Sequence, residues 1–147
     1  MLLEILLCLV LLAILTVMTV NTFGAFFFKN EQQVIINEIR TAVQYAKNQA
    51  LTKGTSMTLT PLDTWSSGME LSSLNPQTNK VEKLYQWQWQ HPAWIVEWKG
   101  VGSDKSITFA SNPLNLLCNG HFSVRKVGNS KAVVIVLNRL GRVRVVI

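Results

Sequence analysis

The residues best suited to chemistry are basic, and they gather at the C-terminal end of the chain. The protein has 147 residues, with 14 Lys plus Arg, 8 Asp plus Glu and a formal net charge of +6 at pH 7. Basic and acidic side chains balance in residues 1–120, so the whole net charge lies in residues 121–147, which contain no acid. The basic residues there are Arg125, Lys126, Lys131, Arg139, Arg142 and Arg144. Because a cluster of one sign concentrates a polyanion around it, this segment favours polyanion binding over a merely solvated basic edge.

Arg142 and Arg144 are the pair best placed to hold phosphate. They lie two residues apart in a predicted strand, so they project from one face about 6.6–6.8 Å apart. The planar guanidinium can grip a phosphate with two hydrogen bonds, which lysine cannot do. We expect Arg139, which precedes a turn at Gly141, to assist them. Since no segment resembles a helix that reads a DNA groove, the expected contacts are to phosphate and are independent of sequence.

Other kinds of site find little support in the sequence. His91 and His121 are far apart, and neither has a Cys or an acid at metal-ligand spacing, so we expect no metal and no cofactor. No glycine-rich phosphate loop, nucleophile motif or paired carboxylates are visible, which predicts a protein that is not an enzyme.

Alternating aromatic residues offer a second candidate surface. Trp87 and Trp89 share a predicted face with Tyr85 and could stack on bases or sugars, as in a carbohydrate-binding module. An alternating aromatic face in a small sheet protein is more often part of the core. We therefore favour a core role for these side chains.

The N-terminal segment has the length and apolar composition of a membrane-spanning helix, which would hold any such site next to a membrane. Residues 5–28 contain no charged side chain and are flanked by Glu4 and Lys29. As a helix they would extend about 36 Å, enough to cross a hydrocarbon core of about 30 Å. A cleaved secretory signal is the alternative, but the first residues carry no Lys or Arg and the apolar run exceeds the usual length of about 7–15 residues. We expect a retained anchor over residues 1–28.

Beyond the anchor, the pattern predicts an amphipathic helix over residues 29–53 and a β-rich region over residues 54–147. Apolar residues recur at helical spacing, and Gly54 follows as a stop signal, so both N-terminal segments form one helix of about fifty residues. These apolar residues are Ile36, Ile39, Val43, Ala46 and Ala50. Segments of period two then follow and predict strands, with turns between them, one over residues 112–115. The predicted strands contain Met57 and Leu59, Tyr85 to Trp89, Ile107 and Phe109, Phe122 and Val124, residues 132–137 and residues 143–147. The fold class is α+β, a long helix packed on an antiparallel sheet.

Glu4 is a costly residue at the edge of an apolar run. Residue chemistry alone weighs an interfacial carboxylate and a functional role equally. The stretch Leu2-Leu3-Glu4-Ile5, followed by a long apolar helix, resembles the start of a mature type IV pilin. The resemblance implies cleavage of a leader by prepilin peptidase and a glutamate that acts in filament assembly. That glutamate is the fifth residue in the family and the fourth here, as expected if this sequence begins one residue inside the mature protein.

The rest of the chain resembles the GspH/FimT family of minor pilins and pseudopilins. The matching segments, in family order, are Ala46 to Ala50, Trp65 with Gly68, Ile107 with Phe109, Gly120 with Phe122, and Gly141-Arg142-Val143-Arg144. The last resembles the Gly-Arg-x-Arg ending of FimT-type minor pilins. This resemblance implies a type IV pilin-like fold, an inner-membrane anchor with a periplasmic domain, and assembly with other pilin subunits into an extracellular pilus. For the FimT branch it implies DNA uptake in natural transformation.

The sequence therefore predicts a minor pilin that binds DNA non-specifically through its basic C-terminal patch. The expected DNA-binding residues are Arg142, Arg144, Arg139, Lys131, Arg125, Lys126 and Gly141, and Glu4 is expected to act in pilus assembly. One alternative is a structural minor pilin or type II secretion pseudopilin that helps to initiate the filament without binding DNA. The anchored carbohydrate-binding module is a further alternative.

Overall fold

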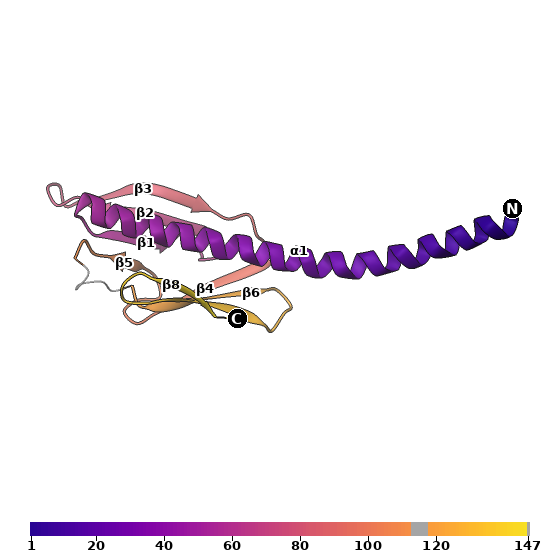
Figure 1. The fold of residues 1–147 in the computed structure, drawn as a ribbon. Coiled ribbons are helices and arrows are strands. Elements are labelled where there is room, and N and C mark those ends of the chain that lie inside the picture. The colour runs from indigo at the N-terminus through magenta and orange to yellow at the C-terminus, as the bar shows by residue number, and fades with distance from the viewer. Residues whose placement is uncertain (113–117, 147) are drawn as a thin grey trace. The chain divides into compact units, whose positions relative to one another are not determined.

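The computed structural model begins with one long helix and continues through short antiparallel strands (Figure 1). It describes residues 1–112 and 118–146, and of residues 19–22 it describes the backbone alone. The turn expected over residues 112–115 and the strand end expected at Ile147 thus fall largely outside the described residues. Contacts divide the chain into two compact units, Met1–Asn37 and Glu38–Ile147. The boundary of the membrane segment at residue 28 stays a prediction.

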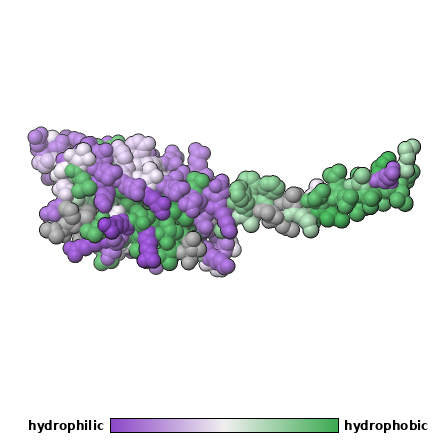
Figure 2. Space-filling view, viewed as in Figure 1, coloured by the Kyte–Doolittle hydropathy of each residue, from purple (hydrophilic) through white to green (hydrophobic). Residues whose placement is uncertain are grey.

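Helix α1 spans Leu2–Lys53, 52 residues, as the sequence predicts. Gly54 follows with a φ of 63°, a left-handed conformation that ends a helix at little steric cost when the residue is glycine. In the first unit, the apolar side chains described between Leu2 and Phe27 are mostly exposed, and Figure 2 shows them as a hydrophobic segment. Within the described residues, α1 is the one helix long and apolar enough to cross a membrane.

The second unit contains two four-stranded antiparallel sheets. The first has the order β3-β2-β1-β5. Its strands are β1 Met57–Pro61, β2 Gly68–Leu74, β3 Val81–Gln88 and β5 Ile107–Phe109. The second has the order β4-β6-β7-β8. Its strands are β4 Trp94–Gly100, β6 Gly120–Lys126, β7 Ala132–Leu137 and β8 Val143–Val146. The α+β class is confirmed, but the strands form two sheets, and strands β2 and β4 were not recognised in the sequence.

The core of the second unit joins the helix to both sheets. Ile39, Val43, Ala46 and Ala50 of α1 are buried, which confirms the apolar face predicted for this helix; Ile36 is buried as well. Trp98 and Phe122 of the second sheet pack with ring centroids 4.6 Å apart, and Trp65 from the β1–β2 connection lies 5.6 Å from Phe122. The Oγ of Ser66 accepts a hydrogen bond of 2.8 Å from the backbone nitrogen of Val96, tying the same connection to β4.

Candidate nucleic-acid interface

A tight turn joins β7 to β8 and presents the C-terminal arginines. The backbone nitrogen of Gly141 donates to the carbonyl of Asn138 (2.9 Å), and that of Asn138 donates to the carbonyl of Arg142 (3.1 Å). The Oδ1 of Asn138 also accepts from the backbone nitrogens of Leu140 (3.0 Å) and Arg142 (2.8 Å). Gly141 adopts a φ of 69°, the left-handed residue expected after a type I turn in a three-residue hairpin loop. The backbone on either side of Arg142 is therefore fixed by hydrogen bonds.

Arg142 and Arg144 are both exposed, and the valines that alternate with them, Val143 and Val145, are half-buried. The sequence predicts both arginines in one strand; the structure places Arg144 in β8 and Arg142 immediately before it, and exposure alternates along residues 142–145 as a strand requires. Arg139 is exposed at the tip of the turn. We call residues 138–144, which hold these three arginines, the C-terminal turn.

The other three basic residues lie at the opposite end of the same sheet. Arg125 pairs with Ala132 across β6 and β7, and Lys131 immediately precedes β7. The guanidinium of Arg125 lies 3.5 Å from the carboxylate of Glu97, and the Nζ of Lys126 lies 5.8 Å from the centroid of the Trp94 ring. The residues predicted as one basic patch thus occupy two ends of the second sheet, and Arg125 shares its end with an acid.

Strand register adds residues that sequence reasoning missed. Lys99 of β4 lies opposite His121 of β6. On the other side of β6, His121 lies opposite Val136 of β7, and Val136 lies opposite Arg144 of β8. Residues directly opposite one another in a sheet share a face. On this face Lys99 and Arg144 are exposed and His121 is half-buried, whereas Trp98, Phe122 and Ile135 are buried on the other face. We call Lys99, His121 and Arg144 the cross-strand row.

Lys47 of α1 also reaches the C-terminal turn. A Cβ placed on Gly141 would lie 3.1 Å from the Cδ of Lys47, so the lysine stem packs against the glycine backbone. Beneath the turn, the Sγ of Cys118 donates weak hydrogen bonds of 3.5 Å to the carbonyls of Asn138 and Arg139. Burial raises the pKa of the Cys118 thiol, so this sulfur stays protonated as a donor. Cys8 and Cys118 both carry free thiols.

The aromatic residues divide between core and surface. Trp89 is 8% exposed, and its Nε1 donates to the carbonyl of Trp65 (2.9 Å), so it belongs to the core as we favoured. Tyr85 is half exposed, and with half-buried Trp87 it packs against Tyr45 of α1, each ring centroid 5.6 Å from that of Tyr45. Because Trp89 is buried, the structure does not offer Trp87 and Trp89 as the paired surface a sugar platform needs.

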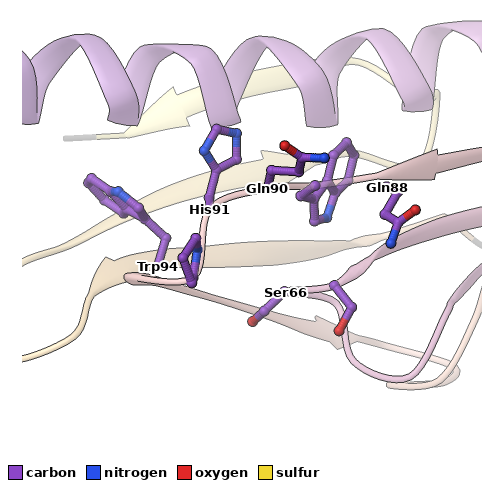
Figure 3. A pocket seen from close by; sticks show the side chains of 8 residues that line it. Ser66, Gln88, Gln90, His91 and Trp94 are labelled. Carbon is purple, nitrogen blue, oxygen red and sulfur yellow. The ribbon is translucent and has the colours of Figure 1, made fainter.

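A shallow pocket of about 390 Å³ lies beside these aromatic residues (Figure 3). His91 and Trp94 line it, with serine and glutamine side chains. In Figure 3 His91 extends toward the helix, away from Ser66, and its Nε2 lies 3.1 Å from the carboxylate of Glu38. This arrangement directs the imidazole to a hydrogen bond with Glu38 of α1 rather than to a serine. Among the described residues, no three His, Cys, Asp or Glu side chains gather as metal ligands.

Glu4 lies in the first turn of α1, where it is exposed. Its Oε2 lies 3.7 Å from the amino nitrogen of Met1, and both groups are open to their surroundings. The expected assembly role of Glu4 stays a prediction.

The long helix, the two sheets and the C-terminal turn together define the class of protein as pilin-like. The chain belongs to the family described as type II transport protein GspH, whose pattern matches residues 36–141. That match ends immediately before Arg142. No curated protein sequence matches the chain.

Solved structures show the same fold. The chain is similar to the type IV minor pilin FimU of Pseudomonas aeruginosa PAO1, with 19% identity and a TM-score of 0.66 over 82% of this chain and 92% of the FimU chain. It is also similar to the minor pseudopilin EpsH of the Vibrio cholerae type 2 secretion system, with 9% identity and a TM-score of 0.60 over 78% of this chain and 94% of the EpsH chain. The type IV pilin-like fold that the resemblance implied is therefore confirmed.

Proposed function

We propose that this protein is a minor pilin of a type IV pilus that binds extracellular DNA for uptake in natural transformation. The observation that carries the proposal is the C-terminal turn, which holds Arg142 exposed just before the edge strand β8 and Arg144 exposed within it. Every acidic residue of the chain lies at or before Asp104 in the sequence, and residues 138–144 contain none. Two acids lie close to β4: Glu97 is paired with Arg125, and the Oδ1 of Asp104 accepts a hydrogen bond of 3.0 Å from the backbone nitrogen of Gly100. The charged side chains of the C-terminal turn itself are therefore all basic.

The rest of the molecule supports a place in a filament. The first unit presents apolar side chains suited to the inner membrane before assembly and to the apolar core of a filament afterwards. Membership of the GspH family and the fold shared with FimU, a type IV minor pilin, support assembly with other pilin subunits. On this proposal the second unit is periplasmic before assembly and extracellular in the pilus, and prepilin peptidase processes the N-terminus.

Phosphate contacts account for the binding. Two arginines on one face can each form a bidentate pair with a phosphate, and the hydrogen bonds around Asn138 hold their backbone in place before DNA arrives. The arginines of the C-terminal turn lie on a turn and a strand, not on a helix that could enter a groove, so we expect binding to be independent of sequence. Affinity is modest, because few phosphates are neutralised.

The test is an equilibrium binding assay with fluorescent duplex DNA and the full chain in a neutral detergent. Replacing Arg142 and Arg144 with Gln should abolish most of the affinity, and replacing both with Lys should do less harm because charge survives. A matched control removes the same charge from two exposed loop lysines, Lys80 and Lys105, and should bind nearly as the unmodified protein does. If the control and the Gln variant lose the same DNA affinity, binding depends on the net charge of the protein and not on the C-terminal turn.

A structural role without DNA binding is the second candidate. It is favoured by the solved relatives, which are named only as a minor pilin and a minor pseudopilin. In that case the basic C-terminal turn contacts another subunit of the filament. The same assay separates the two functions, since a purely structural subunit loses no more DNA affinity in the Arg142 and Arg144 double Gln variant than in the Lys80 and Lys105 control.

A further inference from the structure

We infer that bound DNA runs across the strands of the second sheet, over the cross-strand row, and does not stop at the C-terminal turn. This inference rests on the proposed function and assigns two further contacts, Lys99 and His121. Neither residue belongs to the basic C-terminal set apparent in the sequence around Arg142, since Lys99 comes from β4, 45 positions before Arg144, and that set contains only Lys and Arg.

The geometry of the sheet sets the direction of the path. Arg144, Val136, His121 and Lys99 occupy one row across four adjacent strands. With strands about 4.7–4.9 Å apart, the row extends about 14 Å, the axial rise of about four phosphates along one DNA strand. Arg142 immediately precedes β8, at the Arg144 end of the row. The row and the turn thus place Lys99, His121 and the two arginines over a length that matches a short phosphate run, with neutral Val136 between His121 and Arg144.

An acid marks the edge of this surface. Glu97 lies two residues from Lys99 on β4, on the same face, and pairs with Arg125 at 3.5 Å. A phosphate backbone that followed β4 or β6 along its length would meet this carboxylate. A backbone that crosses the strands at the level of the cross-strand row avoids it. Asp104 lies at the other end of the row's face, where its Oδ1 accepts a hydrogen bond of 3.0 Å from the backbone nitrogen of Gly100. A path along β4 would meet a carboxylate in either direction, so the charge pattern favours a path that crosses the strands between Glu97 and Asp104.

His121 makes the binding depend on pH. The charged groups that face it are Lys99 directly across on β4, Glu97 diagonally on β4, Arg125 along its own strand and Arg144 beyond the neutral Val136. A phosphate bound over the row attracts a protonated imidazole more strongly than an uncharged one. DNA binding is thereby coupled to proton uptake, so affinity rises as pH falls through the range in which histidine gains its charge.

The experiment measures DNA affinity of the full chain in neutral detergent at pH 8.0 and pH 5.5, each over a range of salt. The unmodified protein should bind about two- to fivefold more tightly at the lower pH, the effect of one exposed charge contact. Its log-affinity against log-salt slope should steepen by about 0.9. His121→Gln should remove both the gain in affinity and the steeper slope at low pH. The matched control is His91→Gln, at the chain's other histidine, and it should keep both effects. Lys99→Gln should flatten the slope by about 0.9 at both pH values, and Lys105→Gln should not.

The outcomes separate this inference from the proposed function. If Lys99→Gln and His121→Gln bind as the unmodified protein does, while the Arg142 and Arg144 double Gln variant loses binding, the path across the sheet is wrong and the proposed function stands. If the unmodified protein fails to bind DNA at either pH, both are wrong. Circular dichroism on every variant excludes unfolding as the cause of a loss.

Discussion

Gly141 is the residue on which the presentation of the C-terminal arginines most depends. Its φ of 69° suits glycine, because a side chain in the left-handed region costs about 1–2 kcal/mol. An added Cβ would also lie 3.1 Å from the Lys47 stem. Gly141→Ala should therefore lower the free energy of unfolding by at least about 1 kcal/mol and weaken DNA binding by disturbing Arg142. Chemical denaturation and the DNA-binding assay measure the two effects.

Gly102 supplies the control for that substitution. It has no positive φ, and a Cβ placed on it meets nothing within 4 Å. Gly102→Ala should leave stability and DNA binding nearly unchanged. Equal stability of the two alanine variants would contradict the role given to Gly141.

At the scale of elements, the placement of β4 decides which charges share a face with the arginines. Glu97 and Lys99 both lie on its exposed face. Removing the carboxylate with Glu97→Gln takes a repulsive charge from the edge of the basic surface and releases Arg125. DNA affinity should rise about two- to fivefold. Stability should change by less than about 0.5 kcal/mol, since the ion pair is exposed.

Glu82→Gln is the matched control, because it makes the same change in net charge on β3 of the other sheet. It should raise DNA affinity less than Glu97→Gln does. If both variants gain equally, long-range net charge explains the effect and the outer face of the second sheet has no special part in it.

Much of the fold was predictable from local pattern. The helix end at Gly54, the apolar face through Val43 and the alternation around Arg144 follow from spacing alone. Strand β4 was missed although Trp94, Val96 and Trp98 alternate, because this segment adjoins the aromatic run that ends at Trp89. That omission hid Glu97 and Lys99. Glu97 reaches Arg125, and Lys99 shares a face with Arg144, only because strands from distant parts of the sequence pair in the second sheet. No local pattern specifies that pairing.

At the scale of the whole molecule, the second unit should be separable from the anchor. Its core is drawn from α1 and both sheets, with Ile39, Val43 and Ala46 fully buried. Removing residues 1–28 should leave a soluble monomer that unfolds cooperatively. Sedimentation and chemical denaturation test this. Aggregation, or a broad non-cooperative transition at neutral pH, would mean that the amphipathic helix and the sheets do not form an independent core.

Filament assembly tests the proposed part of Glu4. An unpaired charge in an apolar filament core is costly, so the carboxylate needs a partner there. Glu4→Ala should reduce the amount of this protein in sheared pili while the second unit stays folded. Cys8→Ala, a change in the same exposed helical segment, is the control and should assemble normally. Unchanged incorporation of Glu4→Ala would remove the assembly role.

The salt dependence of DNA binding is the sharpest test of whether Arg142 and Arg144 hold DNA through its phosphates. Neutralising two or three phosphates predicts a slope of log affinity against log salt of about −2 to −3 on duplex DNA. The slope should be the same on two unrelated sequences of equal length. Replacing Arg142 and Arg144 with Gln should flatten it by about 1.8 and lower affinity on both sequences, with circular dichroism unchanged. Equal affinity and equal slope for the folded double variant and the unmodified protein would contradict the account and leave the structural minor pilin as the better description.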